Sequence, residues 1–214
     1  METSPIYVSA KDKSSANSNL INVNGRYYIK GYENIRDASY PANVNGTCGY
    51  TAATILLYWW HKKLGDIIPD KFISPDGGLL KYGYTLQDEL LSIGRDLGYD
   101  NSSWGKPMRN ILVEYFKRNV PNHGATSWYY LLRTYLWGEI DRGRPAIAFG
   151  SFYGNPPSVY ADTTNHDYGG KVFHGVVVYG YSNSNYICHY GWEGFEEVYL
   201  HVKAMGSVTF LNVN

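Results

Sequence analysis

The chain contains 214 residues, and its 19 basic and 19 acidic side chains give a formal net charge of zero. This length fits one large domain or two closely joined halves, and the 44% of hydrophobic residues are enough for a packed core. No apolar run is long enough for a membrane-spanning helix. The balanced charge argues against a protein that binds duplex nucleic acid, which normally presents a basic face.

The two cysteines, Cys48 and Cys188, can form at most one disulfide bond, so the chain is not a disulfide-stabilised scaffold. The first residues lack the basic segment and the apolar stretch of a secretory signal peptide. The abundance of Tyr, Asn, Gly and Ser nevertheless favours a secreted or cell-surface protein whose signal has been removed. A cytoplasmic location is the alternative.

The chain is expected to begin with a polar segment and then to form a strand and a helix. Residues 1–25 show no apolar periodicity, so we expect a flexible tail. Residues 26–32 are expected to form a short strand, and 37–47 a loop rich in Asn, Pro and Gly. Over 48–64 the apolar residues recur with a helical period, and Gly65 ends the expected helix.

Three more helices are expected in the first two thirds of the chain. One runs over 85–97 with Thr85 as its cap, and a second starts at Pro107, a favourable first helical position. The third is predicted over 127–140, with Ser127 as its cap.

After Gly143 the hydrophobic pattern changes from helical to extended. Short strands are expected, separated by Gly, Asn and Ser turns, over 145–149, 172–181, 186–191, 197–202 and 208–213. The long polar segment 150–170 is expected to be a loop, and long loops in compact domains are often functional.

Helices that precede strands in this way indicate an α+β fold rather than alternating βαβ units. We therefore expect a single domain over 26–214. Its helical half covers about 45–141, and its β half covers about 142–214 together with 26–36.

Cys48 stands at the start of an expected helix, directly after a turn that contains Gly46. The unpaired N–H groups and the dipole at a helix N-terminus stabilise a thiolate, the reactive form of cysteine. The same N–H groups can bind a developing oxyanion. A lone cysteine in this position is more often a small buried hydrophobic residue.

His174 lies in an apolar expected strand, far from Cys48 in the sequence. A thiol nucleophile needs such a base from another part of the fold. A single histidine in a strand is commonly a core residue with one hydrogen bond. The two residues together therefore indicate acyl-transfer chemistry more strongly than either does alone.

Four segments in the order expected for one protein family carry a resemblance to it. The segment 48–53, Cys-Gly-Tyr-Thr-Ala-Ala, resembles the nucleophile segment of papain-like bacterial cysteine peptidases, and 140–147 resembles their Gly-Arg-Pro-Val-Ile stretch. The segment 174–181, His-Gly-Val-Val-Val-Tyr-Gly-Tyr, is similar to their His-Ala-Val-Val-Val-x-Gly-Tyr, and 189–194 resembles Asn-Trp-Gly-Trp-Gly-Gly. The streptopain-like peptidases and the bacteriocin-processing, C39-like peptidases show the similarity best.

This resemblance implies a papain-like cysteine peptidase in which Cys48 is the nucleophile and His174 the acid and base. It implies a peptide or protein substrate and a thioester intermediate, and no cofactor or metal ion. The amide that completes the oxyanion site would come from Asn45 or Asn43. His189 stands where the family has the Asn that orients the catalytic histidine.

The orienting residue has several candidates, because an imidazole can accept a hydrogen bond through its bare nitrogen but other acceptors are near in the sequence. Besides His189, they are Asn185, Asp162 and Asp167.

Trp192 and Gly49 are expected at the cleft, where Trp192 would exclude water or would simply belong to the core. If His189 points into the site, strand alternation turns the neighbouring Cys188 away from it.

Three other functions remain open from the sequence. The same fold could carry a deamidase or a transglutaminase-like enzyme, since a thiolate with a histidine serves any acyl transfer. A degenerate scaffold could bind a partner through its many Tyr residues, although core packing also explains them. A metal site formed by Cys48, His174 and His189 is the third possibility, although the six histidines show no usual ligand spacing.

Overall fold

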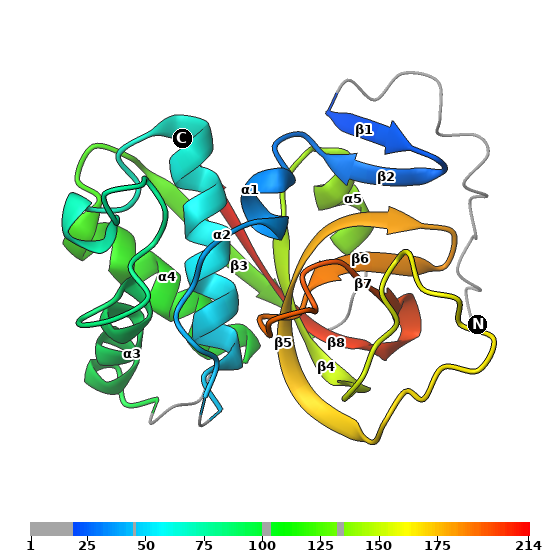
Figure 1. Cartoon of the computed structure of the whole chain (residues 1–214). Helices are drawn as coiled ribbons and strands as arrows, with labels where there is room; N and C mark the ends of the chain where they lie inside the picture. The colour runs from blue at the N-terminus through cyan, green and yellow to red at the C-terminus, as the bar shows by residue number, and fades with distance from the viewer. Residues whose placement is uncertain (1–18, 45, 100–103, 132–134) are drawn as a thin grey trace, which may run out of the picture.

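The computed structural model describes residues 19–44, 46–99, 104–131 and 135–214. It consists of a helical half and a β half that lie side by side (Figure 1). The helices are α1 (Glu33–Arg36), α2 (Cys48–Leu64), α3 (Leu86–Asp96), α4 (Gly105–Asn119) and α5 (Leu136–Asp141). The strands are β1 (Leu20–Val23), β2 (Arg26–Ile29), β3 (Ala125–Tyr130), β4 (Ala146–Tyr153), β5 (Lys171–Ser182), β6 (Asn185–His189), β7 (Val198–His201) and β8 (Met205–Val213).

Helix α2 is the central element of the molecule, and it contacts the helices α1, α3 and α4 and the strands β4 and β5. All of its residues from Gly49 to Trp60 are buried. A single apolar stripe was predicted for this helix. Burial all around it is explained by its position between the two halves, where every face packs against protein.

The helical boundaries follow local signals in the sequence. The Thr85 side chain and Asp88 form a capping box at the start of α3, as the Thr85 cap predicts. The predicted span of α2 is confirmed from Cys48 to Leu64, and Gly65 ends it with a φ of 76°. Helix α4 begins at Gly105, two residues before the proline that was expected to start it.

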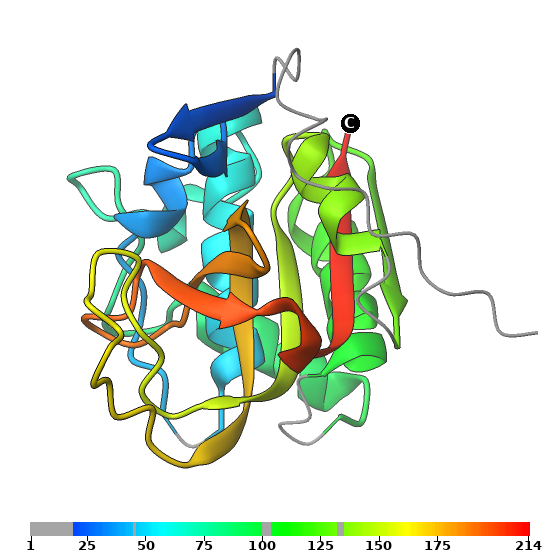
Figure 2. The same cartoon turned by 90° about the vertical axis from the view of Figure 1, so that its right-hand side faces the viewer.

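The strands form one antiparallel sheet with the order β1-β2-β5-β4-β8-β3, and β6 and β7 continue from β5. Strand β5 pairs with β4 and β2 and also with β6. In Figure 2, β8 lies beside β4 and β3, which agrees with this order. The predicted α+β class, with a helical half followed by an antiparallel sheet, is confirmed.

Two predictions about the elements are wrong. The expected helix over 127–140 is a strand in its first part, since β3 pairs with β8 along its whole length and the Ser127 hydroxyl donates to the Phe210 carbonyl instead of capping a helix. Aromatic residues favour strands when a neighbouring strand is available. Only α5 remains of this helix, and 132–134 lie outside the described residues.

The second error concerns the polar tail predicted over 1–25. Residues 20–23 form β1, which pairs with β2 through a turn at Asn24 and Gly25. Both turn residues have positive φ, the conformation of a tight hairpin. Residues 1–18 lie outside the described residues. Among the described helices none is long and apolar enough to cross a bilayer.

The two halves lie close together where two glycines face each other. A Cβ atom placed on Gly175 of β5 would lie 3.3 Å from the Cα atom of Gly49 in α2 and 2.8 Å from the Phe149 ring. No side chain fits between this helix and this strand, so the absence of two side chains allows the contact.

We predict that Gly175→Ala lowers the free energy of unfolding by about 1–3 kcal/mol, because the added methyl group collides with the Phe149 ring and also presses against Gly49 of α2. The matched control is Gly170→Ala, at a position where a Cβ atom meets nothing within 4 Å. Urea denaturation of both variants measures the effect. Equal stability of the two variants would show that the close contact is not a constraint.

Candidate active site

Cys48 is the first residue of α2, and its side chain is partly exposed. The turn before it contains Gly46, whose φ of 79° favours glycine. In the described part of the chain, the Thr47 side chain does not cap α2. Its hydroxyl donates instead to the Val44 carbonyl at 2.7 Å. The first turn of α2 also contains no acidic residue.

These two features leave the N-terminus of α2 suited to negative charge. A capping side chain would occupy the first N–H groups of the helix, and an acidic residue would offset the positive end of its dipole. Without either, the helix can stabilise a thiolate at Cys48 and an oxyanion that forms beside it.

His174 lies on β5, with only 4% of its surface exposed. Its Nε2 atom is 2.6 Å from the backbone carbonyl oxygen of Tyr190. A carbonyl oxygen can only accept, so Nε2 carries the proton. In the neutral ring this leaves Nδ1 without a proton and able to act as a base.

The His174 ring is enclosed by two aromatic side chains on the turn after β6. Its centroid lies 4.4 Å from that of Tyr190 and 4.6 Å from that of Trp192. Burial lowers the pKa of His174, and the hydrogen bond to the Tyr190 carbonyl partly opposes this effect. At neutral pH the isolated ring is therefore uncharged and ready to accept a proton.

Cys48 and His174 each directly precede one of two glycines that lie close together, Gly49 and Gly175. The Tyr190 ring lies against the His174 ring, and burial raises the pKa of the Tyr190 phenol. The pairing of Cys48 with His174 stays a prediction from the sequence.

His189 does not make the predicted hydrogen bond to His174. Its Nδ1 atom accepts a hydrogen bond of 2.9 Å from the Gly191 N–H. Its Nε2 atom is buried and has no hydrogen-bond partner among the described residues. Neither ring nitrogen of His189 binds His174, and the acceptor of the His174 hydrogen bond is the Tyr190 carbonyl. The main chain of the next residue takes the position predicted for the His189 side chain.

The other three candidates for the orienting residue do not replace this carbonyl. Asn185 is the first residue of β6, at the opposite end of that strand from His189. Asp162 accepts hydrogen bonds from Thr164, and Asp167 accepts from the Gly169 N–H. All three lie in or next to turns and not at the His174 ring.

The two asparagines predicted for the oxyanion site have different outcomes. Asn45 lies outside the described residues. The Asn43 Nδ2 atom is buried without a hydrogen bond among the described residues, and it would lie 3.5 Å from a Cβ atom on Gly191. Asn43 therefore holds a spare donor next to the turn after β6, but this atom is not exposed to a substrate.

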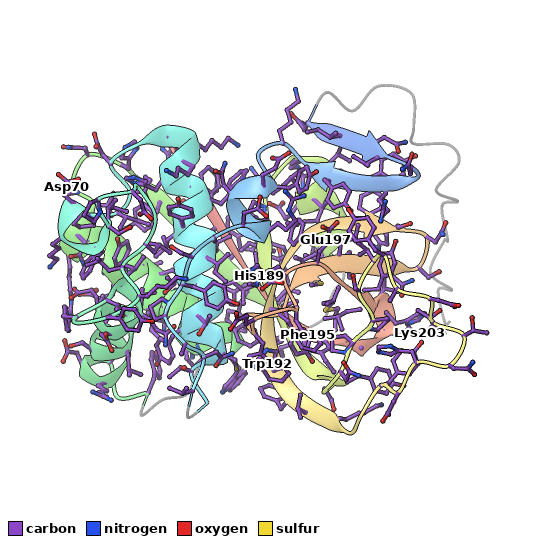
Figure 3. All side chains as sticks on the ribbon, viewed as in Figure 1. Asp70, His189, Trp192, Phe195, Glu197 and Lys203 are labelled. Atoms are coloured by element: carbon purple, nitrogen blue, oxygen red, sulfur yellow. The ribbon has the colours of Figure 1, made fainter. Side chains whose placement is uncertain are left out.

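Trp192 lies against the His174 ring, on the loop that follows β6 (Figure 3). His189 is fully buried, and Figure 3 shows it between α2 and the β half. Gly49 was expected at the open cleft, but it is buried in the contact between α2 and β5. Cys188 is fully buried, and burial raises the pKa of its thiol well above the ordinary value.

Two features of the site were not predicted. The first is the Tyr190 carbonyl, which no side-chain motif can reveal. The second is Gln87, whose side chain joins α3 to the start of α2: Nε2 donates to the Ala42 carbonyl at 3.3 Å and Oε1 accepts from the Thr51 hydroxyl at 2.9 Å. Gln87 is the only Gln in the chain, and this rarity is the one feature of the sequence that could have drawn attention to it.

Within the described ranges no group of three or more His, Cys, Asp or Glu side chains is placed to hold a metal ion. The predicted alternative of a site formed by Cys48, His174 and His189 thus gains no support from the arrangement of these side chains.

Comparison with known proteins gives matches among solved structures alone. No family model and no curated protein sequence matches the chain. One similar structure is described as a candidate C39-like peptidase from Bacillus anthracis, at 13% identity and a TM-score of 0.41, over 82% of this chain and 95% of that one. Another is a digestive procathepsin L2 proteinase from Tenebrio molitor larval midgut, at 11% identity and a TM-score of 0.41, over 90% of this chain and 69% of that one.

We predict that acid destabilises the protein through His189, because burial lowers the pKa of this side chain to about 3. The unfolded chain binds a proton near pH 6.5 and the folded chain does not, so stability is full above that pH and falls as the pH drops towards 3. Between pH 7 and pH 4 the loss from this group is about 3 kcal/mol.

Urea denaturation at the two pH values measures this loss, and His189→Asn should reduce it. His123→Gln, which changes a partly exposed histidine at the end of the helical half, is the control and should leave the loss unchanged. A wild-type loss that persists in His189→Asn would contradict the assignment.

Proposed function

We propose that the protein is a cysteine peptidase with a papain-like arrangement, in which Cys48 is the nucleophile and His174 the acid and base. The observation that carries the proposal is the hydrogen bond from His174 Nε2 to the Tyr190 carbonyl. It selects the ring tautomer whose free Nδ1 can take the thiol proton, on the strand that touches the start of α2.

The reaction begins with transfer of the Cys48 proton to His174. The thiolate then attacks the carbonyl carbon of a peptide bond, and a C–S bond forms while the carbonyl oxygen gains negative charge. The imidazolium of His174 gives its proton to the leaving nitrogen as the C–N bond breaks, which leaves a thioester on Cys48. A water molecule that loses a proton to His174 then attacks this thioester, and the acid product and the thiol are released.

The negative oxygen formed in these steps needs hydrogen-bond donors. The uncapped N–H groups at the start of α2 are the first candidates, because they lie next to Cys48 and point out of the helix. Asn45 stays a prediction for a further donor. Asn43 could serve only after a rearrangement, since its Nδ2 atom is buried.

Trp192 supports the proposal through its position on the His174 ring, 4.6 Å between centroids. An aromatic cover of this kind keeps water away from the hydrogen bond between His174 and the Tyr190 carbonyl, and a hydrogen bond is stronger in a medium of low dielectric constant.

We predict that iodoacetamide alkylates Cys48 faster than Cys188 by at least about tenfold at neutral pH, because only an accessible thiolate reacts. Cys48 is partly exposed, whereas Cys188 is fully buried and burial raises the pKa of its thiol. Mass spectrometry of tryptic peptides after timed labelling gives both rates. Equal slow labelling of the two thiols would contradict the nucleophile assignment.

We also predict that Cys48→Ala and His174→Ala each lower hydrolysis of a peptide library by at least about 1,000-fold, because each removes an essential partner of the same step. Cys188→Ala, which removes a buried thiol from the core, is the control and keeps activity. Loss of activity in all three variants would point to a folding defect.

Other readouts of the same assay separate the alternative functions. Ammonia released from glutamine side chains without peptide cleavage would indicate a deamidase, and transfer to an added amine would indicate a transglutaminase-like enzyme. If Cys48 is intact and reactive but no substrate is turned over, the result would indicate a scaffold that binds a partner without catalysis.

A further inference from the structure

We propose that His189 is a positioning residue, which holds the peptide unit between Tyr190 and Gly191 and thereby fixes His174. The role in catalysis rests on the function proposed above, whereas the hydrogen bonds themselves are features of the fold. His189 then acts through the main chain, and it does not touch the reacting atoms.

A single planar peptide unit connects the two histidines. The Tyr190 carbonyl and the Gly191 N–H belong to the same peptide bond and point in opposite directions. His174 Nε2 binds the carbonyl end at 2.6 Å, and His189 Nδ1 binds the N–H end at 2.9 Å. Rotation of this unit would break both hydrogen bonds, so the bond to His189 opposes any rotation that releases His174.

The peptide unit lies in a turn that packs against α2. Strand β6 ends at His189, and Gly191 continues the chain with a φ of 73°. The Tyr190 N–H donates to the Phe195 carbonyl at 2.9 Å, which closes the turn behind the unit. A Cβ atom on Gly191 would lie 3.2 Å from the Thr51 side chain, so the turn rests against the first part of α2.

The surroundings of His189 keep Nδ1 available as an acceptor. The side chain is fully buried, its ring meets the Tyr40 ring edge-on at 5.0 Å between centroids, and Asp37 at the end of α1 is the charged group that acts on it. Burial disfavours the protonated ring. A neutral ring with a bare Nδ1 carries its proton on Nε2, and this Nε2 has no partner among the described residues.

The chain of hydrogen bonds also affects the strength of the contact at His174. When the Gly191 N–H donates to His189, electron density shifts towards the Tyr190 oxygen, which becomes a better acceptor. The bond to this oxygen raises the pKa of His174 against the effect of burial. His189 therefore supports both the orientation of His174 and the stability of its protonated form.

Variants at position 189 separate the hydrogen bond from the packing. His189→Phe keeps a ring beside Tyr40 but has no acceptor. His189→Asn restores an acceptor, because the side-chain oxygen of Asn commonly binds the N–H two residues later in a turn. His189→Leu replaces His189→Phe if the latter does not fold.

The control is His61→Leu. His61 Nδ1 accepts a hydrogen bond of 3.2 Å from the Ile68 N–H, so the same kind of contact is removed at the other end of α2. This contact lies about 20 Å from Cys48 along the helix, so its loss should leave the site unchanged.

Two measurements on the full chain test the proposal. The first is the side-chain Nε2–H signal of His174 in proton–nitrogen NMR, which should be protected from exchange in the wild type, His189→Asn and His61→Leu and lost in His189→Phe. The second is the pH dependence of Cys48 alkylation. His189→Phe should lower the rate about tenfold at neutral pH and move the rise of the profile to higher pH by about one unit, because the thiolate loses the support of the protonated His174.

Retention of the NMR signal and of the alkylation profile in His189→Phe would overturn the proposal, and so would equal effects of His189→Phe and His61→Leu. A wild-type alkylation rate that His174→Ala leaves unchanged would instead refute the proposed catalytic pair. In that case the NMR signal still decides whether His189 holds the peptide unit.

Discussion

The close contact between Gly49 of α2 and Gly175 of β5 is the constraint on which the site depends. It joins the two halves where neither residue has a side chain, and Cys48 and His174 directly precede these two glycines in the sequence. The burial of α2 on all sides follows from the same arrangement, because this helix fills the space between the other helices and the sheet. The packing of the two halves therefore depends on two glycines, Gly49 and Gly175, that each follow a residue of the proposed catalytic pair.

Different structural elements surround the two residues of the proposed catalytic pair, Cys48 and His174. Among the described residues, the Thr47 side chain does not cap the first N–H groups of α2 beside Cys48, because its hydroxyl donates to the Val44 carbonyl. The turn after β6 provides the acceptor for His174 and the Trp192 ring that covers it. The resemblance in sequence implied that a side chain would accept the hydrogen bond from His174. A main-chain carbonyl, that of Tyr190, accepts it instead.

Much of this could be predicted from the sequence where the signal is local. The span of α2 and the Thr85 cap of α3 both rest on short patterns of residue types. The strand β3 was mistaken for a helix because its partner β8 lies at the far end of the chain, and pairing over such a distance overrides local preference. The Tyr190 carbonyl could not be predicted, because every residue has a carbonyl and only the turn aims this one at His174.

The most direct test of the central claim is a pH titration in which the ultraviolet absorbance of the Cys48 thiolate is measured. The titration compares the wild type with His174→Ala, and Cys48→Ala serves as the blank. The account predicts that the thiolate absorbance appears at higher pH in His174→Ala than in the wild type, because the thiolate loses its imidazolium partner. Identical titrations of the two proteins would contradict it.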